Sequence, residues 1–131
     1  MTIFYSHIMP HPTIEGLEVI FEALPEFCDP QDHFSEPDDI EAVITKKECL
    51  SDSYWFCARV VVRMIEFPKV SASDSLGCCS YETFKEFHQY DNADYFRDMV
   101  DTATSDLIPQ LSKLMGSIES LLSKCEEKAG V

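Results

Sequence analysis

The sequence predicts an α+β domain in which an antiparallel β-hairpin, of two or three strands, is packed by several helices and followed by a long C-terminal helix. Three observations lead to this fold class. Residues 54–67 are dense in aromatic and β-branched residues, the flanking segments repeat apolar residues at helical spacing, and apolar residues from 107 to 125 alternate at intervals of four and three. With 131 residues, 45% of them hydrophobic, residues 1–131 are expected to form a single domain.

The first 24 residues predict a short strand followed by a helix. The strand covers TIFYSHIM, and Pro10 and Pro12 end it. Residues 13–24 predict a helix that Pro25 terminates. Its apolar side would carry Ile14, Leu17, Ile20, Phe21 and Leu24, and another side would carry the acids Glu15, Glu18 and Glu22.

Residues 25–37 form a proline-rich, acidic connection with no clear periodicity. Ser35 is expected to cap a helix that begins at Glu36-Pro37-Asp38, where proline and acids suit the first turn. We expect this helix to end near Leu50.

The clearest strand lies between Tyr54 and Phe67, where one alternating set of side chains is wholly apolar and predicts the core-facing side. The following segment, KVSASDSLGCCSY, predicts the antiparallel partner, with a turn or bulge at residues 73–75 or at Gly77.

Residues 82–90 predict a short helix that Ser80 is expected to cap. The next helix is predicted at residues 91–106, DNADYFRDMVDTATSD, with Asp91 as its N-cap and Asp94 at its third position. Because side chains three and four residues apart share a helix face, the acids of this helix form one stripe, broken only by Arg97. The core-facing side would carry Phe96, Met99, Val100, Ala103 and Leu107, so the stripe faces outward. The stripe consists of Asp91, Asp94, Asp98 and Asp101.

The last helix is predicted to carry an apolar seam at heptad spacing, with Pro109 at its start or at a kink. Nearly three heptads favour packing of the seam on the hairpin, and pairing with a second copy remains the alternative. The seam consists of Leu107, Leu111, Leu114, Ile118, Leu121 and Cys125.

The charge of the chain restricts its partners. Ten basic residues against 24 acidic ones give a net charge of −14, and residues 1–45 contain no Lys or Arg. Binding to nucleic acid or to an anionic membrane requires Lys and Arg, so we expect neither partner. A basic protein is expected instead.

The opening MTIFYSHIMPHP lacks the basic and apolar regions of a signal peptide, which predicts a cytoplasmic location.

Metal, cofactor and catalytic motifs are weak in this sequence. The six cysteines are expected to be reduced, and neither they nor the four histidines have the spacing of a zinc site. No phosphate-binding glycine motif is present. Cys78 or Cys79 with His88 as a base is the one nucleophilic arrangement worth weighing, and it matches no known motif. We therefore predict no enzyme activity, cofactor or metal.

Rows of carboxylates on rigid helices can imitate the regular charges of a DNA strand. The residues SYWFCARVVV, SLGCCSYETFKEF and DYFRDMVDTA resemble small, acidic, uncharacterised proteins of bacteriophages and mobile elements, over about residues 36–108. That resemblance implies a role, in the host cytoplasm, of the kind played by inhibitors of CRISPR and restriction complexes, some of which are DNA mimics.

Two functions are therefore compared. The first is a non-enzymatic DNA mimic that blocks the nucleic-acid-binding surface of a host defence protein, with Asp91, Asp94, Asp98 and Asp101 as leading contacts and Glu15, Glu18 and Glu22 as secondary ones. The alternative is a dimeric structural or adaptor protein that uses the seam Leu107, Leu111, Leu114, Ile118 and Leu121.

Overall fold

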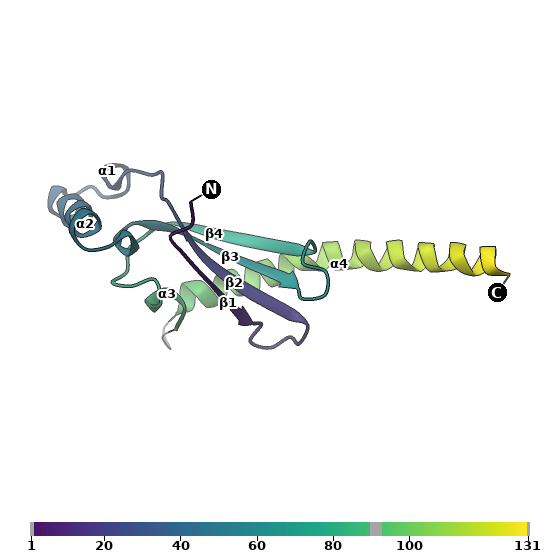
Figure 1. Cartoon of the computed structure of the whole chain (residues 1–131). Coiled ribbons are helices and arrows are strands. Elements are labelled where there is room, and N and C mark those ends of the chain that lie inside the picture. Colours follow the sequence, from purple (N-terminus) through teal and green to yellow (C-terminus); the bar gives the residue numbers. More distant parts are fainter. Residues whose placement is uncertain (1, 90–92, 131) are drawn as a thin grey trace.

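The computed structural model describes residues 2–89 and 93–130. A four-stranded antiparallel sheet with strand order β1-β2-β3-β4 has a long helix, α4, lying across one face (Figure 1). The α+β class and the long C-terminal helix are confirmed, and the sheet has four strands. The strands are β1 (Tyr5–Pro10), β2 (Leu17–Leu24), β3 (Phe56–Met64) and β4 (Ser71–Cys79).

The predicted hairpin is formed by β3 and β4. Alternate residues of β3 are fully buried, from Phe56 to Val62, as the apolar alternation predicts. The chain reverses at residues 65–70, so the turn is not at residues 73–75. A register shift opposite Phe56 and Ala58 marks a bulge at Gly77–Cys78, where Cys78 has φ of 59°.

The predicted helix at residues 13–24 is wrong, because residues 17–24 form strand β2, which pairs with β1 on one side and β3 on the other. Leu17, Val19, Phe21 and Ala23 are buried, and the residues between them face the opposite side of the sheet. The sequence LEVIFEAL fits both a helical stripe and a strict alternation. Because this segment lies between β1 and β3, its backbone N–H and C=O groups form hydrogen bonds with both neighbours, and this favours the strand over the helix.

Two helices, α1 (Pro30–His33) and α2 (Pro37–Cys49), lie at one end of the sheet (Figure 1). Glu36, not Ser35, occupies the N-cap of α2, without a capping side-chain hydrogen bond, so that detail of the prediction is wrong. The predicted end near Leu50 is confirmed. Trp55, buried after the short 3-10 helix η1 (Asp52–Tyr54), donates from Nε1 to the carbonyl oxygen of Cys28 at 2.8 Å and joins this end to the sheet.

After the short helix α3 (Glu86–Gln89), α4 runs without interruption from Asp94 to Ala129. The predicted boundary between two C-terminal helices is therefore wrong, and Pro109 lies inside one helix of 36 residues. Asp94 is its first residue and Ala93 its N-cap, so Asp94 is not at the third position. The predicted cap Asp91 lies outside the described residues.

The core lies between the sheet and the first half of α4. All five predicted core residues of this helix, Phe96, Met99, Val100, Ala103 and Leu107, are buried. Leu111 packs against the same core, whereas Ile118 and Leu121 are 51% and 60% exposed. The prediction that the seam packs within the chain holds for its first part only, and the rest of α4 projects beyond the sheet (Figure 1).

Within residues 2–89 and 93–130, we find no helix with the length and apolar character needed to cross a membrane.

Candidate acidic binding face

The outer side of α4 carries a row of three exposed carboxylates: Asp94, Asp98 and Asp101. Intervals of four and three residues bring neighbouring side chains to about 5–6 Å from one another. The burial of Phe96, Val100 and Ala103 on the inner side fixes the rotation of the helix, and this fixes the outward direction of the acids. The predicted outward orientation of this part of the stripe is confirmed. We call these three residues the α4 acid row.

Arg97 lies within the α4 acid row. Its Nη1 is 3.5 Å from Oδ1 of Asp94, and the two side chains are 58% and 82% exposed. An ion pair this long between exposed groups adds little stability. Its position beside the row nevertheless lowers the local negative potential near Asp94.

A histidine ties the loop between β1 and β2 to the helix beside the row. His11 Nε2 lies 3.0 Å from Oγ1 of Thr104, and the Thr104 hydroxyl donates to the carbonyl oxygen of Val100. His11 Nδ1 accepts from the backbone N–H groups of Thr13 and Ile14, so in the neutral ring Nε2 carries the proton and donates to Thr104. Desolvation lowers the pKa of His11, and the charge of Asp101 opposes this shift.

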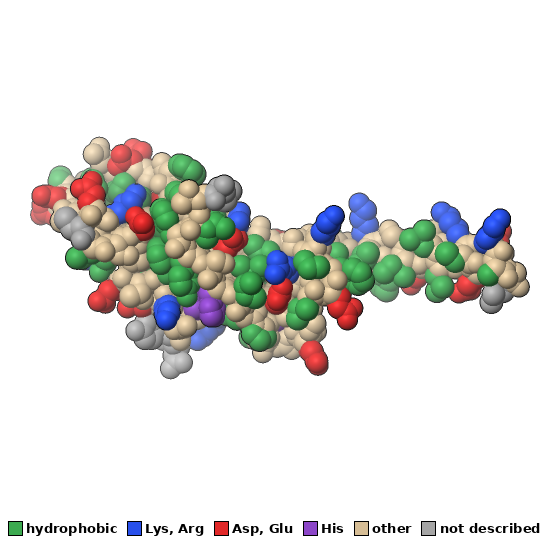
Figure 2. Space-filling view, in the orientation of Figure 1, with side chains coloured by type: hydrophobic (Ala, Val, Ile, Leu, Met, Phe, Trp, Pro, Cys, Tyr) green, Lys and Arg blue, Asp and Glu red, His purple; other side chains and the backbone are tan. Residues whose placement is uncertain are grey.

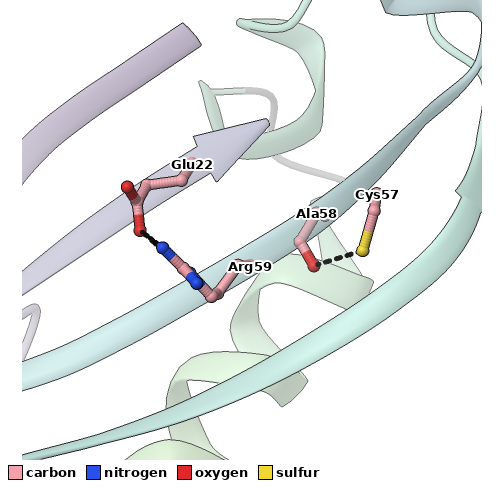
Figure 3. A network of polar contacts seen from close by, with 4 residues as sticks. All are labelled: Glu22, Cys57, Ala58 and Arg59. Carbon is pink, nitrogen blue, oxygen red and sulfur yellow. Dashed lines mark hydrogen bonds and ion pairs between the residues drawn. The ribbon is translucent and has the colours of Figure 1, made fainter. Parts of the chain in front are cut away.

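The second predicted acid row does not exist as a row. Glu18 and Glu22 lie on strand β2, on the face of the sheet opposite α4, where arginines of β3 pair with them. Glu22 Oε1 is 2.8 Å from Arg59 Nη2 and 3.0 Å from its Nε (Figure 3). Glu18 Oε1 is 2.6 Å from Arg63 Nε. The arginines balance the charges of these two carboxylates, and both glutamate side chains are mostly buried from solvent. They therefore do not extend the negative face.

Glu15, the remaining predicted member of that row, is exposed in the loop between β1 and β2. His11 holds the same loop against α4, as described above. Glu15 therefore remains an acid on a loop tethered to α4, separated from Glu18 and Glu22.

Further carboxylates gather at the end of the molecule formed by α1 and α2. Figure 2 shows acidic side chains clustered there. Asp38, Asp39 and Glu41 of α2 are exposed, as are Asp29 and Asp32 beside and within α1. The negative field therefore covers the end of the sheet as well as α4.

The sequence offers His88 as a base for Cys78 or Cys79, but in the structure the ring of His88 contacts two residues of β1. The Nε2 atom of His88 lies 3.1 Å from the hydroxyl of Tyr5, and the ring stacks on His7 with centroids 4.9 Å apart. Desolvation raises the pKa of Cys78 to about 11 and that of Cys79 to about 12, which leaves very little thiolate at neutral pH. Among the described residues, no group of three or more His, Cys, Asp or Glu side chains is arranged to hold a metal ion.

Glu26 makes a contact between distant parts of the chain that the sequence does not predict. Its Oε1 accepts from the backbone N–H of Cys28 at 2.8 Å, and its Oε2 accepts from that of Cys78 at 2.6 Å. A Cβ atom at Gly77 would lie 2.8 Å from Oε2, so glycine is needed for this approach. No local pattern reveals such a contact, because Glu26 and Cys78 lie about 50 residues apart in the sequence.

Comparison with known proteins leaves the site to be interpreted from its own geometry. No protein family model, no curated protein and no solved structure matches this chain.

Proposed function

We propose that this protein is a non-enzymatic inhibitor that binds the basic, nucleic-acid-binding surface of another protein by presenting α4 in place of a DNA strand. The α4 acid row is the observation that supports this function most strongly. A host defence complex of the CRISPR or restriction type is the partner implied by the sequence resemblance.

The row is pre-organised for binding. Its helix is held by buried side chains on the inner face, so little conformational freedom is lost when a partner binds the outer face. Charges spaced at helical intervals then meet a basic groove without rearrangement.

The charge distribution favours rapid association with a basic partner. Residues 108–131 contain three lysines and three glutamates, so residues 1–107, with seven basic and 21 acidic residues, carry the entire net charge of −14. Such a field attracts a basic partner over long distances and makes association sensitive to salt.

The test is affinity capture from a host lysate with the full chain as bait, at low and at high salt. The triple variant D94N/D98N/D101N should no longer capture the basic protein, because it removes the three negative charges of the α4 acid row. The fold should be retained, because all three side chains are exposed. The matched control E119Q/E126Q/E127Q changes the net charge by the same amount at exposed positions of the projecting helix and should retain it. Equal capture by both variants contradicts the proposal.

The runner-up function is a dimeric structural or adaptor protein, in which the charge serves solubility alone. The exposure of Ile118 and Leu121 on the projecting part of α4 is the observation that favours it. In that case the triple variant of the acid row would act normally, and disruption of the apolar seam would abolish function.

A further inference from the structure

The projecting part of α4 has a broad apolar stripe with too few partners in its own chain. From Leu111 onward, the stripe contains the remaining seam residues. Met115, directly after Leu114, and Leu122, directly after Leu121, widen it. Figure 2 shows hydrophobic side chains along this part of the helix and lysines standing at one edge. The side chains of the stripe that are at least half exposed are Met115, Ile118, Leu121 and Leu122.

We propose that this stripe binds a second copy of the chain, with the two α4 helices antiparallel. This inference is independent of the inhibitor function, because it concerns the opposite end of the helix from the α4 acid row.

Charge explains why a second copy can approach at this segment. We call residues 1–107, which carry the net charge of −14, the body of the chain. Two such bodies repel one another, whereas the charges of the three lysines and three glutamates of residues 108–131 balance. Self-association is therefore least opposed along the projecting helix.

Steric constraints select the antiparallel orientation. The sheet covers the apolar face of α4 as far as Leu111, which packs against the core. The neighbouring Gln110 donates from Nε2 to the carbonyl oxygen of Ser71 at 2.6 Å. The stripe continues that same face. Paired helices lie about 8–10 Å apart, and packed layers lie about 10 Å apart. A parallel pair would therefore force both sheets into the space between the helices.

The antiparallel arrangement fits the available length. If Ile118 of one copy lies level with Leu121 of the other, Leu114 lies level with Cys125. Lys128 then lies level with Leu111, the last residue that packs against the core. The overlap, residues 111–128, contains 18 residues and is about 27 Å long. The two bodies then lie at opposite ends of the paired helices.

The contact area predicts a reversible dimer. A stripe about 27 Å long and about 10 Å wide covers about 300 Å² on each copy. The two copies together bury about 600 Å², which is small compared with the total of about 1,200–2,000 Å² in stable interfaces. The dimer should therefore dissociate on dilution.

The first test is the molar mass of the full chain, measured by sedimentation equilibrium over a wide range of concentrations. The mass should rise from 15.0 kDa toward twice that value. The variant I118D should remain at 15.0 kDa at every concentration, because the charge enters the stripe at an exposed site. The control S123D places the same charge on the exposed opposite side and should dimerise as the unmodified chain does.

The second test distinguishes the two orientations by disulfide formation. With glutathione disulfide as the oxidant, two thiols become one disulfide and two molecules of glutathione are released. L114C should form a covalent dimer through residues 114 and 125, whereas in the unmodified chain the two Cys125 side chains lie about 16 Å apart along the helix axis. Equally rapid linkage of Cys125 to Cys125 in the unmodified chain would overturn the antiparallel arrangement. A monomer at all concentrations, or a dimer unaffected by I118D, would overturn the proposal as a whole.

Discussion

Glu26 shows how one side chain joins a loop to a distant strand. Each carboxylate oxygen accepts one backbone N–H, from Cys28 and from Cys78, and Gly77 leaves the space for this approach. The contact also supports the bulge in β4, where Cys78 adopts a positive φ that costs a non-glycine residue free energy. Loop 25–29 is thereby fixed against the end of the sheet that carries α1 and α2.

Replacing Glu26 with glutamine tests this role. An amide has only one acceptor oxygen, so its NH₂ group would face one of the two N–H donors. E26Q should lower the free energy of unfolding by about 1.5–3 kcal/mol, the usual contribution of a hydrogen bond to a charged group. Urea denaturation measures the change. The control E66Q removes an exposed carboxylate and should change stability by less than about 0.5 kcal/mol; equal effects would rule out the bridging role.

His88 makes stability depend on pH. Desolvation, with smaller contributions from His7 and Lys85, lowers its pKa from 6.5 to about 4. The unfolded chain therefore binds more protons than the folded chain between about pH 6.5 and 4, and this contribution to stability is complete above pH 6.5 and decreases as the pH falls through that range. Urea denaturation should show that the free energy of unfolding falls more between pH 7.5 and pH 5 for the unmodified protein than for H88Q. Parallel losses would contradict the assignment.

At the scale of elements, the sequence correctly predicts the helices and strands whose two sides differ clearly in polarity. The prediction fails where contacts with residues far away in the sequence determine the secondary structure. The alternation in β3 and the buried residues of α4 are correctly predicted, because each pattern fits one period only. Strand β2 fits both periods, and Arg59 and Arg63, which pair with its two glutamates, lie about 40 residues away. The acid row on α4 is predictable, whereas the loss of the second row follows from those ion pairs.

The two halves of α4 differ in what they contribute to the stability of one chain. Leu107 is fully buried against the sheet, so L107A should cost about 2–5 kcal/mol. Leu121 is 60% exposed, so L121A should cost less than about 1 kcal/mol in the monomer. Urea denaturation, at a concentration where sedimentation shows only monomer, measures both. A large effect of L121A there would mean that the second half packs within the chain.

At the scale of the whole molecule, charge and apolar surface are separated along α4. The body carries the net charge of −14 and the α4 acid row, and the projecting half of the helix is neutral and apolar on one side. In the two proposals, the first of these surfaces binds a basic partner and the second binds another copy of the chain. In the antiparallel dimer, two acidic bodies would be held a fixed distance apart, which would increase the avidity for a partner with two basic sites.

The slope of the logarithm of the association constant against the logarithm of salt concentration, measured for the captured basic partner, tests the central claim most directly. The unmodified protein should show a steep negative slope. D94N/D98N/D101N should bind about tenfold or more weakly at low salt, a loss of about 1.4 kcal/mol or more, and should show a shallower slope, because three charges no longer contact the partner. An affinity and a slope unchanged by the triple variant would contradict the assignment of the α4 acid row as the binding surface.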